Sequence, residues 1–495
     1  MTLKLAVVGG GVSGLAAAHR ALELGRAAGR PVAVSLFEAR ARLGGAVGTE
    51  RRDGYLVEMG ADMFVTDKPW ALSLCERLGL GGRLVGANAA YRRSLVLRAG
   101  KPLPVPEGFM LMAPARLGRV LASPILSLRG KLRILCEPFV PARHDDDDES
   151  LGAFARRRLG KEALERLVEP LVAGIYTGDP EHLSLRATLP RFLAMEREHG
   201  SLWRGQRRAL GRGRAEEGAS GARYGLFVSF PDGMAELLDA LETRLRAGGV
   251  ALELGTSVLG LERTAAGFAL TRRRPARPRP GRAAWTEPPP SDGETVRELF
   301  DAVVVALPAP RGAALLAAAS PALAAALGSI EHASSAIVVS GYRRADVRHP
   351  LDAFGLVVPA AEGRQIFSVS FASRKFPGRA PEGHVLLRSF VGGLRHGELL
   401  RRSDEALCAL VRRELAALLG VGGRPDFELV ARHERAMPQY DVGHLGRVAA
   451  IERLLAAEPA LAVATNALHG VGVPDCVHAG ERAAEHVWAR ATAPS

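Results

Sequence analysis

The stretch Gly9-Gly10-Gly11-Val12-Ser13-Gly14 decides the fold, because it joins an apolar run at Lys4–Gly9 to a helix-like run at Leu15–Leu24. Glycines in a G-x-G-x-x-G spacing are common in turns, but between a strand and a helix they are typical of dinucleotide binding. Gly9 allows the tight turn, Gly11 lets the backbone approach a pyrophosphate, and Gly14 permits close helix–strand packing. The free N–H groups of the helix start can then bind the phosphates. The sequence therefore predicts a bound dinucleotide.

A second apolar run, Val32–Glu38, ends in the carboxylate that can accept hydrogen bonds from ribose hydroxyls. Directly after Glu38 comes Ala39-Arg40-Ala41-Arg42-Leu43-Gly44-Gly45. This segment resembles the R-x-G-G element of flavoprotein amine oxidases and their relatives. A plain nicotinamide dehydrogenase does not need that element, so FAD is favoured over NAD.

Two further apolar runs, Asp301–Leu307 and Leu461–Ala464, lie far along the chain. Near-continuous apolar runs suit parallel strands that are covered on both faces. We therefore expect one nucleotide-binding domain assembled from both ends of the chain, with other domains inserted. The glycine-rich segment Gly470–Asp475 and the helix-like run Cys476–Ala489 offer a second helix N-terminus, whose dipole would stabilise reduced, anionic flavin.

The net charge of +13 on 495 residues first suggests a nucleic-acid partner. Much of that charge lies in two segments, 204–223 with six Arg and two Glu, and 272–297 with seven Arg and three acidic residues. Trp285 is the only aromatic residue in these two segments. Because aromatic and basic residues do not alternate there, we expect solvated loops or insertions and no nucleic-acid binding.

The cysteines indicate neither a zinc site nor a disulfide framework, because Cys75, Cys136, Cys408 and Cys476 form no C-x-x-C pair. No metal site is expected, and a reduced, cytoplasmic compartment fits best. We expect no signal peptide at the N-terminus and no membrane-spanning helix, because no run of 18 apolar residues exists.

Residues 109–136 hold five cations, no acidic residue and many Leu and Ile side chains. A basic amphipathic segment of this kind can lie in a membrane interface. It can equally form a helical subdomain that packs on its own core, and the sequence leaves both interpretations open.

Several longer blocks make the chain resemble the oxygen-dependent, FAD-containing protoporphyrinogen oxidases nearly end to end. The blocks that carry this resemblance are 174–180, 183–188, 195–202, 356–359, 371–373, 376–381, 391–393, 437–440 and 443–444. One departure is Gly60-Ala61-Asp62-Met63-Phe64, where the bacterial branch commonly has Gly-Pro-x-Ser-Phe. That departure puts details of the flavin contacts in doubt but leaves the fold unchanged.

The resemblance implies an α/β fold with a Rossmann-like FAD-binding domain, an inserted α+β substrate domain and a helical, membrane-binding domain. The expected FAD domain takes 1–90, part of 225–300 and 445–495. The helical or membrane-associated domain takes 91–224 with part of the substrate region, and 301–444 is mainly substrate-binding. The expected FAD contacts are Gly9, Gly10, Gly11, Val12, Ser13, Gly14, Glu38, Ala39, Arg42, Gly44, Gly45, Gly60, Ala61, Asp62, Met63, Val258, Gly472 and Val473.

The resemblance further implies oxidation of protoporphyrinogen IX to protoporphyrin IX, the penultimate step of heme biosynthesis. Three rounds of hydride transfer to FAD, each followed by reoxidation with O2, would release H2O2. The apolar ring and its propionates need an apolar slot and a cation. Phe371 is the expected slot residue, Arg98 the expected carboxylate anchor, and Gly355 a further substrate-binding residue.

Other functions stay open at this point. Coproporphyrinogen III oxidation to coproporphyrin III uses the same flavin chemistry on a ring with four propionates. An FAD amine oxidase or desaturase shares the FAD domain but lacks the longer blocks. A non-catalytic, membrane-peripheral flavin-binding protein would use 109–136 as its working surface. The family also suggests a homodimer, peripheral on the inner face of the cell membrane.

Overall fold

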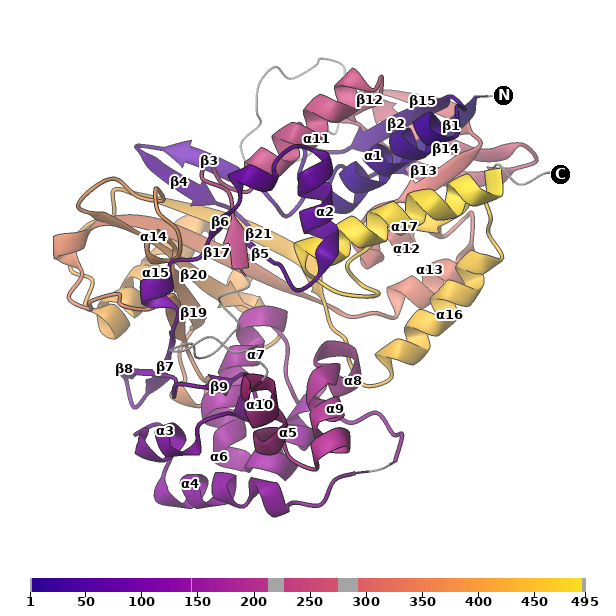
Figure 1. The fold of residues 1–495 in the computed structure, drawn as a ribbon. Coiled ribbons are helices and arrows are strands. Elements are labelled where there is room, and N and C mark those ends of the chain that lie inside the picture. Colours follow the sequence, from indigo (N-terminus) through magenta and orange to yellow (C-terminus); the bar gives the residue numbers. More distant parts are fainter. Residues whose placement is uncertain (1, 144, 212–226, 275–292, 492–495) are drawn as a thin grey trace.

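The computed structural model describes residues 2–143, 145–211, 227–274 and 293–491. One half of the molecule is built on a five-stranded sheet in which every pairing is parallel (Figure 1). In spatial order its strands are β12 (Ala251–Leu254), β2 (Val32–Glu38), β1 (Leu3–Val8), β16 (Ala302–Val305) and β22 (Leu461–Val463). The prediction of a parallel sheet assembled from both ends of the chain is therefore confirmed.

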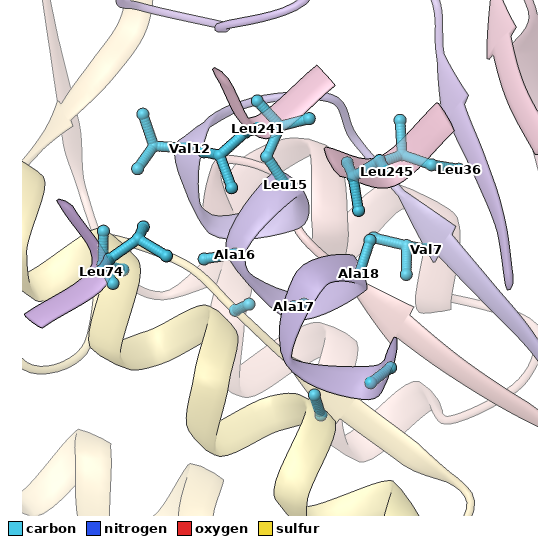
Figure 2. Packing of buried hydrophobic residues seen from close by; sticks show 14 of the residues in the cluster. Val7, Val12, Leu15, Ala16, Ala17, Ala18, Leu36, Leu74, Leu241 and Leu245 are labelled. Atoms are coloured by element: carbon cyan, nitrogen blue, oxygen red, sulfur yellow. The ribbon is translucent and has the colours of Figure 1, made fainter. Parts of the chain in front are cut away.

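Both faces of this sheet are covered, as the continuous apolar strands predict. On one face the first helix packs with three others, and Figure 2 shows Val12, Leu15 and Ala16 of that helix among buried strand and helix side chains. These helices are α1 (Val12–Ala27), α2 (Pro69–Arg77), α11 (Ala235–Ala247) and α17 (Val473–Ala491). Leu5 and Val7 of β1 point to this face, whereas Ala6 and Val8 point to the other. Burial of successive side chains on opposite sides fixes the central position of β1.

The opposite face is covered by three helices and an antiparallel sheet of three strands. They are α12 (Ala309–Leu316), α13 (Pro321–Gly328), α16 (His444–Ala456), β13 (Ser257–Thr264), β14 (Gly267–Arg274) and β15 (Glu294–Phe300). The expected domain boundary at residue 301 therefore lies too early. Strand β16 belongs to the parallel sheet, and α12 and α13 pack on it, because their apolar side chains share its core.

The second half of the molecule contains a seven-stranded sheet. Its spatial order is β21 (Phe427–Pro438), β17 (His332–Arg343), β20 (His384–Gly392), β19 (Ile366–Phe371), β18 (Gly355–Val357), β7 (Ser94–Arg98) and β8 (Lys101–Pro104). All pairings are antiparallel except that of β18 with β7. Helix α15 (Asp404–Leu419) covers one face, and α14 (Ala372–Lys375) follows β19.

Short pairings connect the two halves. They are β3 (Thr49–Arg52) with β4 (Tyr55–Glu58), and β11 (Phe227–Ser229) between β5 (Phe64–Val65) and β6 (Val85–Gly86). The loop between β4 and β5 carries residues 59–63.

A helical region lies beneath the seven-stranded sheet in Figure 1 and has a core of its own. The region begins with two paired strands of two residues each, β9 (Phe109–Met110) and β10 (Ala113–Pro114). Its helices are α3 (Leu117–Ala122), α4 (Leu128–Leu135), α5 (Leu151–Leu159), α6 (Lys161–Ala163), α7 (Glu169–Tyr176), α8 (Leu185–Thr188), α9 (Pro190–His199) and α10 (Leu202–Gly211). A π-helical turn, Leu164–Val168, joins α6 to α7. The segment 109–136 thus contains two short helices.

Most of the two basic segments lies outside the described residues, which omit 212–226 and 275–292. The described part of 204–223 belongs to α10, and the described parts of 272–297 end β14 and begin β15. No helix in the described ranges has both the length and the apolar character needed to cross a bilayer.

Candidate functional site

The glycine turn after β1 has the geometry that its sequence predicts. Gly9 adopts φ +112°, and a Cβ on it would lie 2.2 Å from the carbonyl oxygen of Ala306. A Cβ on Gly14 would lie 1.9 Å from the carbonyl oxygen of Gly9, so α1 and β1 touch through their backbones. Gly11 is the N-cap of α1 and provides no side-chain cap. The N–H groups of the first helical turn, which includes Val12 and Ser13, are therefore available to an anion.

Glu38 ends β2 beside this turn. Its Oε2 accepts a hydrogen bond from the Gly10 N–H at 2.8 Å, and its Oε1 accepts one from the Arg40 N–H at 2.8 Å. Each carboxylate oxygen can accept a second hydrogen bond, so both remain able to accept one from a ribose hydroxyl. Ala39 follows at the strand end, and Val258 lies just beyond the Thr256 N–H that donates to the Glu38 carbonyl.

The loop 42–47 lies directly against the glycine turn. The Gly44 N–H donates to the carbonyl oxygen of Gly10 at 2.8 Å, and a Cβ on Gly45 would lie 3.1 Å from the Gly11 Cα. The Arg42 guanidinium donates to the carbonyl oxygens of Leu43 and Gly45, which holds the loop closed. Burial lowers the pKa of Arg42 to about 10, still far above neutral, so the side chain stays a cation.

Residues 60–63 continue this path of backbone. A Cβ on Gly60 would lie 1.6 Å from the carbonyl oxygen of Ala46, so only glycine fits there. Ala61 and Met63 are half-buried. The Asp62 carboxylate pairs with Lys375 at 3.2 Å and with Arg388 at 2.8 Å. Asp62 is therefore held by side chains of the seven-stranded sheet and its following helix.

Helix α17 begins at the far end of the same region. The Gly472 N–H donates to Asp475 Oδ2 at 3.1 Å, and Asp475 Oδ1 accepts a hydrogen bond from Lys68 Nζ at 2.6 Å. Val473 is buried in the core shared with α1. This helix start thus carries its own carboxylate, and Lys68 balances the charge of that carboxylate.

Together these segments form a continuous strip of backbone from the start of α1 to residues 60–63. Gly11 leaves open backbone at the helix start, because only the Gly45 Cα lies within 4 Å of its would-be Cβ, and such open backbone is what the close approach of a dinucleotide requires. Gly44 and Gly60 instead allow close packing within the protein, since their would-be Cβ atoms meet the carbonyl oxygens of Val47 and Ala46. Residues 12–488 match the family described as flavin containing amine oxidoreductase. The chain belongs to this family. It is an FAD-dependent oxidoreductase, and the strip fits that cofactor.

This flavin-containing amine oxidoreductase is similar over nearly its whole length to proteins with more specific names. It is 36% identical to a coproporphyrinogen III oxidase of Propionibacterium freudenreichii, over 98% of this chain and 90% of the relative. It is 28% identical to a mitochondrial protoporphyrinogen oxidase of Nicotiana tabacum, over 98% of this chain and 94% of the relative. A crystal structure from Exiguobacterium sp. 255-15, named as a candidate protoporphyrinogen oxidase, superposes with a TM-score of 0.83 at 30% identity and covers 98% of both chains.

The seven-stranded sheet separates the expected substrate residues of this oxidoreductase. Phe371 is completely buried in the core between the sheet and α15, so it does not line an open slot. Side chains alternate along a strand, and Phe371 shares its face with Leu387, its partner on β20. The expectation for Phe371 is therefore wrong: the apolar pattern of Ile366–Phe371 does not reveal which face is covered by a helix.

Arg98 and Gly355 lie on the opposite face of the same sheet. Two rows cross this face, one with Ser94, Gly355, Ser370 and Arg388, and the next with Val96, Val357, Ser368 and Phe390. Arg98 lies two residues beyond Val96 and thus on the same face. A Cβ on Gly355 would lie 2.4 Å from the carbonyl oxygen of Val369, which explains the glycine by strand packing.

The fold brings together several residues that no sequence motif singles out. Phe390 is half-exposed, and its ring lies 5.9 Å from that of Phe367. Arg388 and Lys375 reach Asp62 from a distant part of the chain. Phe390 and Ser389 are neighbours on β20, so strand alternation predicts that their side chains lie on opposite faces of the sheet. No spacing in the sequence links Asp62 to Lys375 or Arg388.

Proposed function

We propose that this protein oxidises a porphyrinogen to the corresponding porphyrin as a step of heme biosynthesis, with coproporphyrinogen III as its substrate. The observation that carries this proposal is the end-to-end similarity, at 36% identity, to a protein named coproporphyrinogen III oxidase. Protoporphyrinogen IX, the substrate expected from the sequence, is the second candidate, favoured by the 28% identity to a protoporphyrinogen oxidase.

The face that carries Phe390 suits such a substrate. It presents an aromatic ring pair, Phe367 and Phe390, beside small side chains, and it carries Arg98 toward its edge. A tetrapyrrole ring can pack on aromatic and small apolar surfaces, and guanidinium groups bind carboxylates in a planar, two-point geometry. Gly174 of α7 lies against Val357 and limits this face on the side of the helical region.

FAD held at this site would supply the hydride-accepting chemistry and the reactivity with O2, while the protein supplies binding and orientation. The Gly11–Gly45 contact and the start of α1 would hold the phosphates, and Glu38 the ribose. The backbone of residues 60–63 would support the ring system next to the substrate face. In this arrangement the chain's own residues position two flat molecules against each other.

The test is an assay of the purified, FAD-loaded protein with both porphyrinogens in air, followed by porphyrin fluorescence. We expect both coproporphyrin III and protoporphyrin IX to form, with the higher kcat/KM for coproporphyrinogen III. No fluorescence from either substrate would overturn the proposal. Anaerobic addition of porphyrinogen should bleach the flavin absorbance, whereas a non-catalytic flavin-binding protein would keep it.

Arg98 is the proposed anchor for a propionate. Replacing it with alanine should raise KM several-fold and change kcat little, because the carboxylate contact is made equally in the ground state and the transition state. Steady-state kinetics of Arg98→Ala and the wild-type protein measure this. An unchanged KM would remove Arg98 from the substrate site.

We further propose that the protein docks peripherally on anionic membrane through α4. Leu128, Leu132 and Cys136 are exposed at intervals of four residues, and Phe139 beyond them is 81% exposed. Arg129 is exposed beside them, and neither it nor Lys131 has an ion-pair partner among the described residues. Apolar side chains flanked by cations suit an anionic headgroup layer.

Fewer cations are available to a membrane than the five in 109–136 suggest, because three of them have partners within the protein. Arg116 and Arg119 pair with Glu107, and Arg133 donates to carbonyl oxygens of Arg157 and Arg158. A vesicle-pelleting assay at low salt tests the proposal. Protein that stays in the supernatant with vesicles rich in anionic lipid would contradict it.

A further inference from the structure

Asp62, Lys375 and Arg388 form a buried ionic cluster next to the strip that receives the cofactor. Their side chains are 14%, 10% and 2% exposed. Two cations share the single carboxylate, with Lys375 Nζ at 3.2 Å and Arg388 Nη1 at 2.8 Å from the same Oδ2. A buried ion pair is costly unless its charges balance, so an excess cation in this place needs an explanation.

The cluster also binds the backbone of the 60–63 loop directly. Arg388 donates through its other Nη to the carbonyl oxygen of Gly60, and the carbonyl oxygen of Asp62 accepts a hydrogen bond from Ser229 Oγ at 2.8 Å. Arg379, also buried, donates to that same Ser229 hydroxyl at 3.2 Å and to the carbonyl oxygen of Phe230. Both ends of the Gly60–Asp62 turn are therefore fixed by side chains, one end by Arg388 of β20 and the other by Ser229 of β11.

The charges of the cluster do not cancel. Asp62 stays ionised: burial opposes its ionisation, but Lys375 and Arg388 lower its pKa far more. Glu58 and Arg379 are the nearest further pair, one of each sign, and they add no net charge when both are ionised. Burial and Arg388 lower the pKa of Lys375, whereas Asp62 raises it. With Lys375 protonated, one unit of positive charge remains beside Gly60, where an added Cβ would meet the carbonyl oxygen of Ala46.

We propose that Lys375 and Arg388 are positioning residues for the flavin: through Asp62 and Gly60 they fix the backbone platform, and their excess positive charge stabilises the reduced cofactor. This inference rests on the proposed FAD site. A flavin gains negative charge on two-electron reduction, and a fixed cation in a buried site interacts with that charge more strongly than one in water. The two cations have different roles: Arg388 binds the carbonyl oxygen of Gly60, and Lys375 supplies the surplus positive charge.

The test measures the midpoint potential and the FAD dissociation constant of the loaded protein at pH 8, where Glu58 is ionised. Lys375→Met leaves the cluster neutral. We expect it to weaken binding of reduced FAD about tenfold relative to oxidised FAD, which lowers the potential by about 30 mV for a two-electron couple. Lys375→Arg keeps the charge and should keep the wild-type potential.

The double variant Asp62→Asn/Lys375→Met separates charge from structure. It removes one charge of each sign, so the cluster keeps its surplus of one and the potential should return to the wild-type value. Arg388→Lys keeps the charge but loses the bond to Gly60, so FAD should bind more weakly in both redox states with an unchanged potential. If Lys375→Met does not fold, the double variant and Arg388→Lys still test the two roles.

Arg412→Met is the matched control, because Arg412 pairs with Glu428 on the far side of the seven-stranded sheet. It removes one cation and should leave the potential unchanged. Equal potentials in wild type and Lys375→Met, or equally lowered potentials in Lys375→Met and the double variant, would overturn the inference. A wild-type protein that binds no FAD would instead overturn the proposed function.

Discussion

At the scale of single residues, the glycines of the first turn have different physical tasks. Gly14 meets the carbonyl oxygen of Gly9, a backbone atom that cannot rotate away. Gly11 has a φ of −74° and open space in front of it, apart from the Gly45 Cα 3.8 Å from its would-be Cβ. Gly14 is therefore required for packing, whereas Gly11 leaves the open space that we propose for the approach of the cofactor.

These tasks predict opposite outcomes for two alanine substitutions. Gly14→Ala should lower the free energy of unfolding of the apoprotein by about 3 kcal/mol, because the added methyl group overlaps fixed backbone. Gly11→Ala should cost less than about 1 kcal/mol in stability, yet weaken FAD binding at least about tenfold by filling the space near the phosphates. Urea unfolding and FAD titration of both variants measure this; the reverse pattern would refute the assignment.

Glu58 predicts a pH dependence of stability. It is buried, and desolvation raises its pKa from 4.5 to about 7, against the hydrogen bonds it accepts from the Met234 N–H and the Thr49 hydroxyl. Because its pKa is higher in the folded state, the folded protein binds the proton more tightly than the unfolded chain. Stability is then fully present below about pH 4.5 and is lost as the pH rises to about 7.

Glu58→Gln should remove this loss, which is on the order of 3 kcal/mol for a shift of this size. Urea unfolding from pH 5 to pH 8.5 should show a flatter profile for the variant than for the wild type, and a more stable variant at pH 8.5. Parallel profiles would mean that Glu58 is ionised in the folded protein throughout this range.

At the scale of elements, α4 exposes two leucines that do not contribute to the core of the helical region. Leu128 is 73% exposed and Leu132 is 54% exposed, while Ile134 on the other side of the helix is completely buried. The double change Leu128→Ser/Leu132→Ser should reduce vesicle binding more than tenfold, because each leucine transfers a large apolar area. It should leave thermal unfolding unchanged.

The control for α4 is Leu259→Ser/Leu299→Ser. These leucines are also exposed, but they lie on β13 and β15 of the FAD half of the molecule. Pelleting with anionic vesicles at low salt should distinguish the two double variants. Equal binding by both would show that α4 is not the docking element.

At the scale of the whole molecule, the FAD half depends on the last part of the chain. Helix α17 packs so closely on α1 that a Cβ on Gly480 would lie 2.1 Å from the carbonyl oxygen of Ser13. Gly480→Val should therefore push the two helices apart and abolish tight FAD binding. Gly446→Val in α16, where no atom lies within 4 Å of the added Cβ, is the control. FAD retained equally by both variants would contradict this dependence.

The sequence by itself determined the local features of the FAD half. The G-x-G-x-x-G turn, the carboxylate that ends β2 and the apolar strands are short-range patterns, and each follows from backbone geometry or from burial on both faces of a strand. They were sufficient to predict the parallel sheet, whereas the individual FAD contacts stay a prediction. The longer blocks carried the resemblance to the porphyrinogen-oxidising family.

Only the tertiary structure decided which side chains share a surface. It buried Phe371 and left Phe390 half-exposed, because α15 covers one face of the seven-stranded sheet and strand alternation places the two rings on opposite faces. It also joined Asp62 to Lys375 and Arg388 across hundreds of residues. Such pairings depend on how the two halves of the molecule pack. Local sequence patterns therefore cannot predict partners that lie so far apart along the chain.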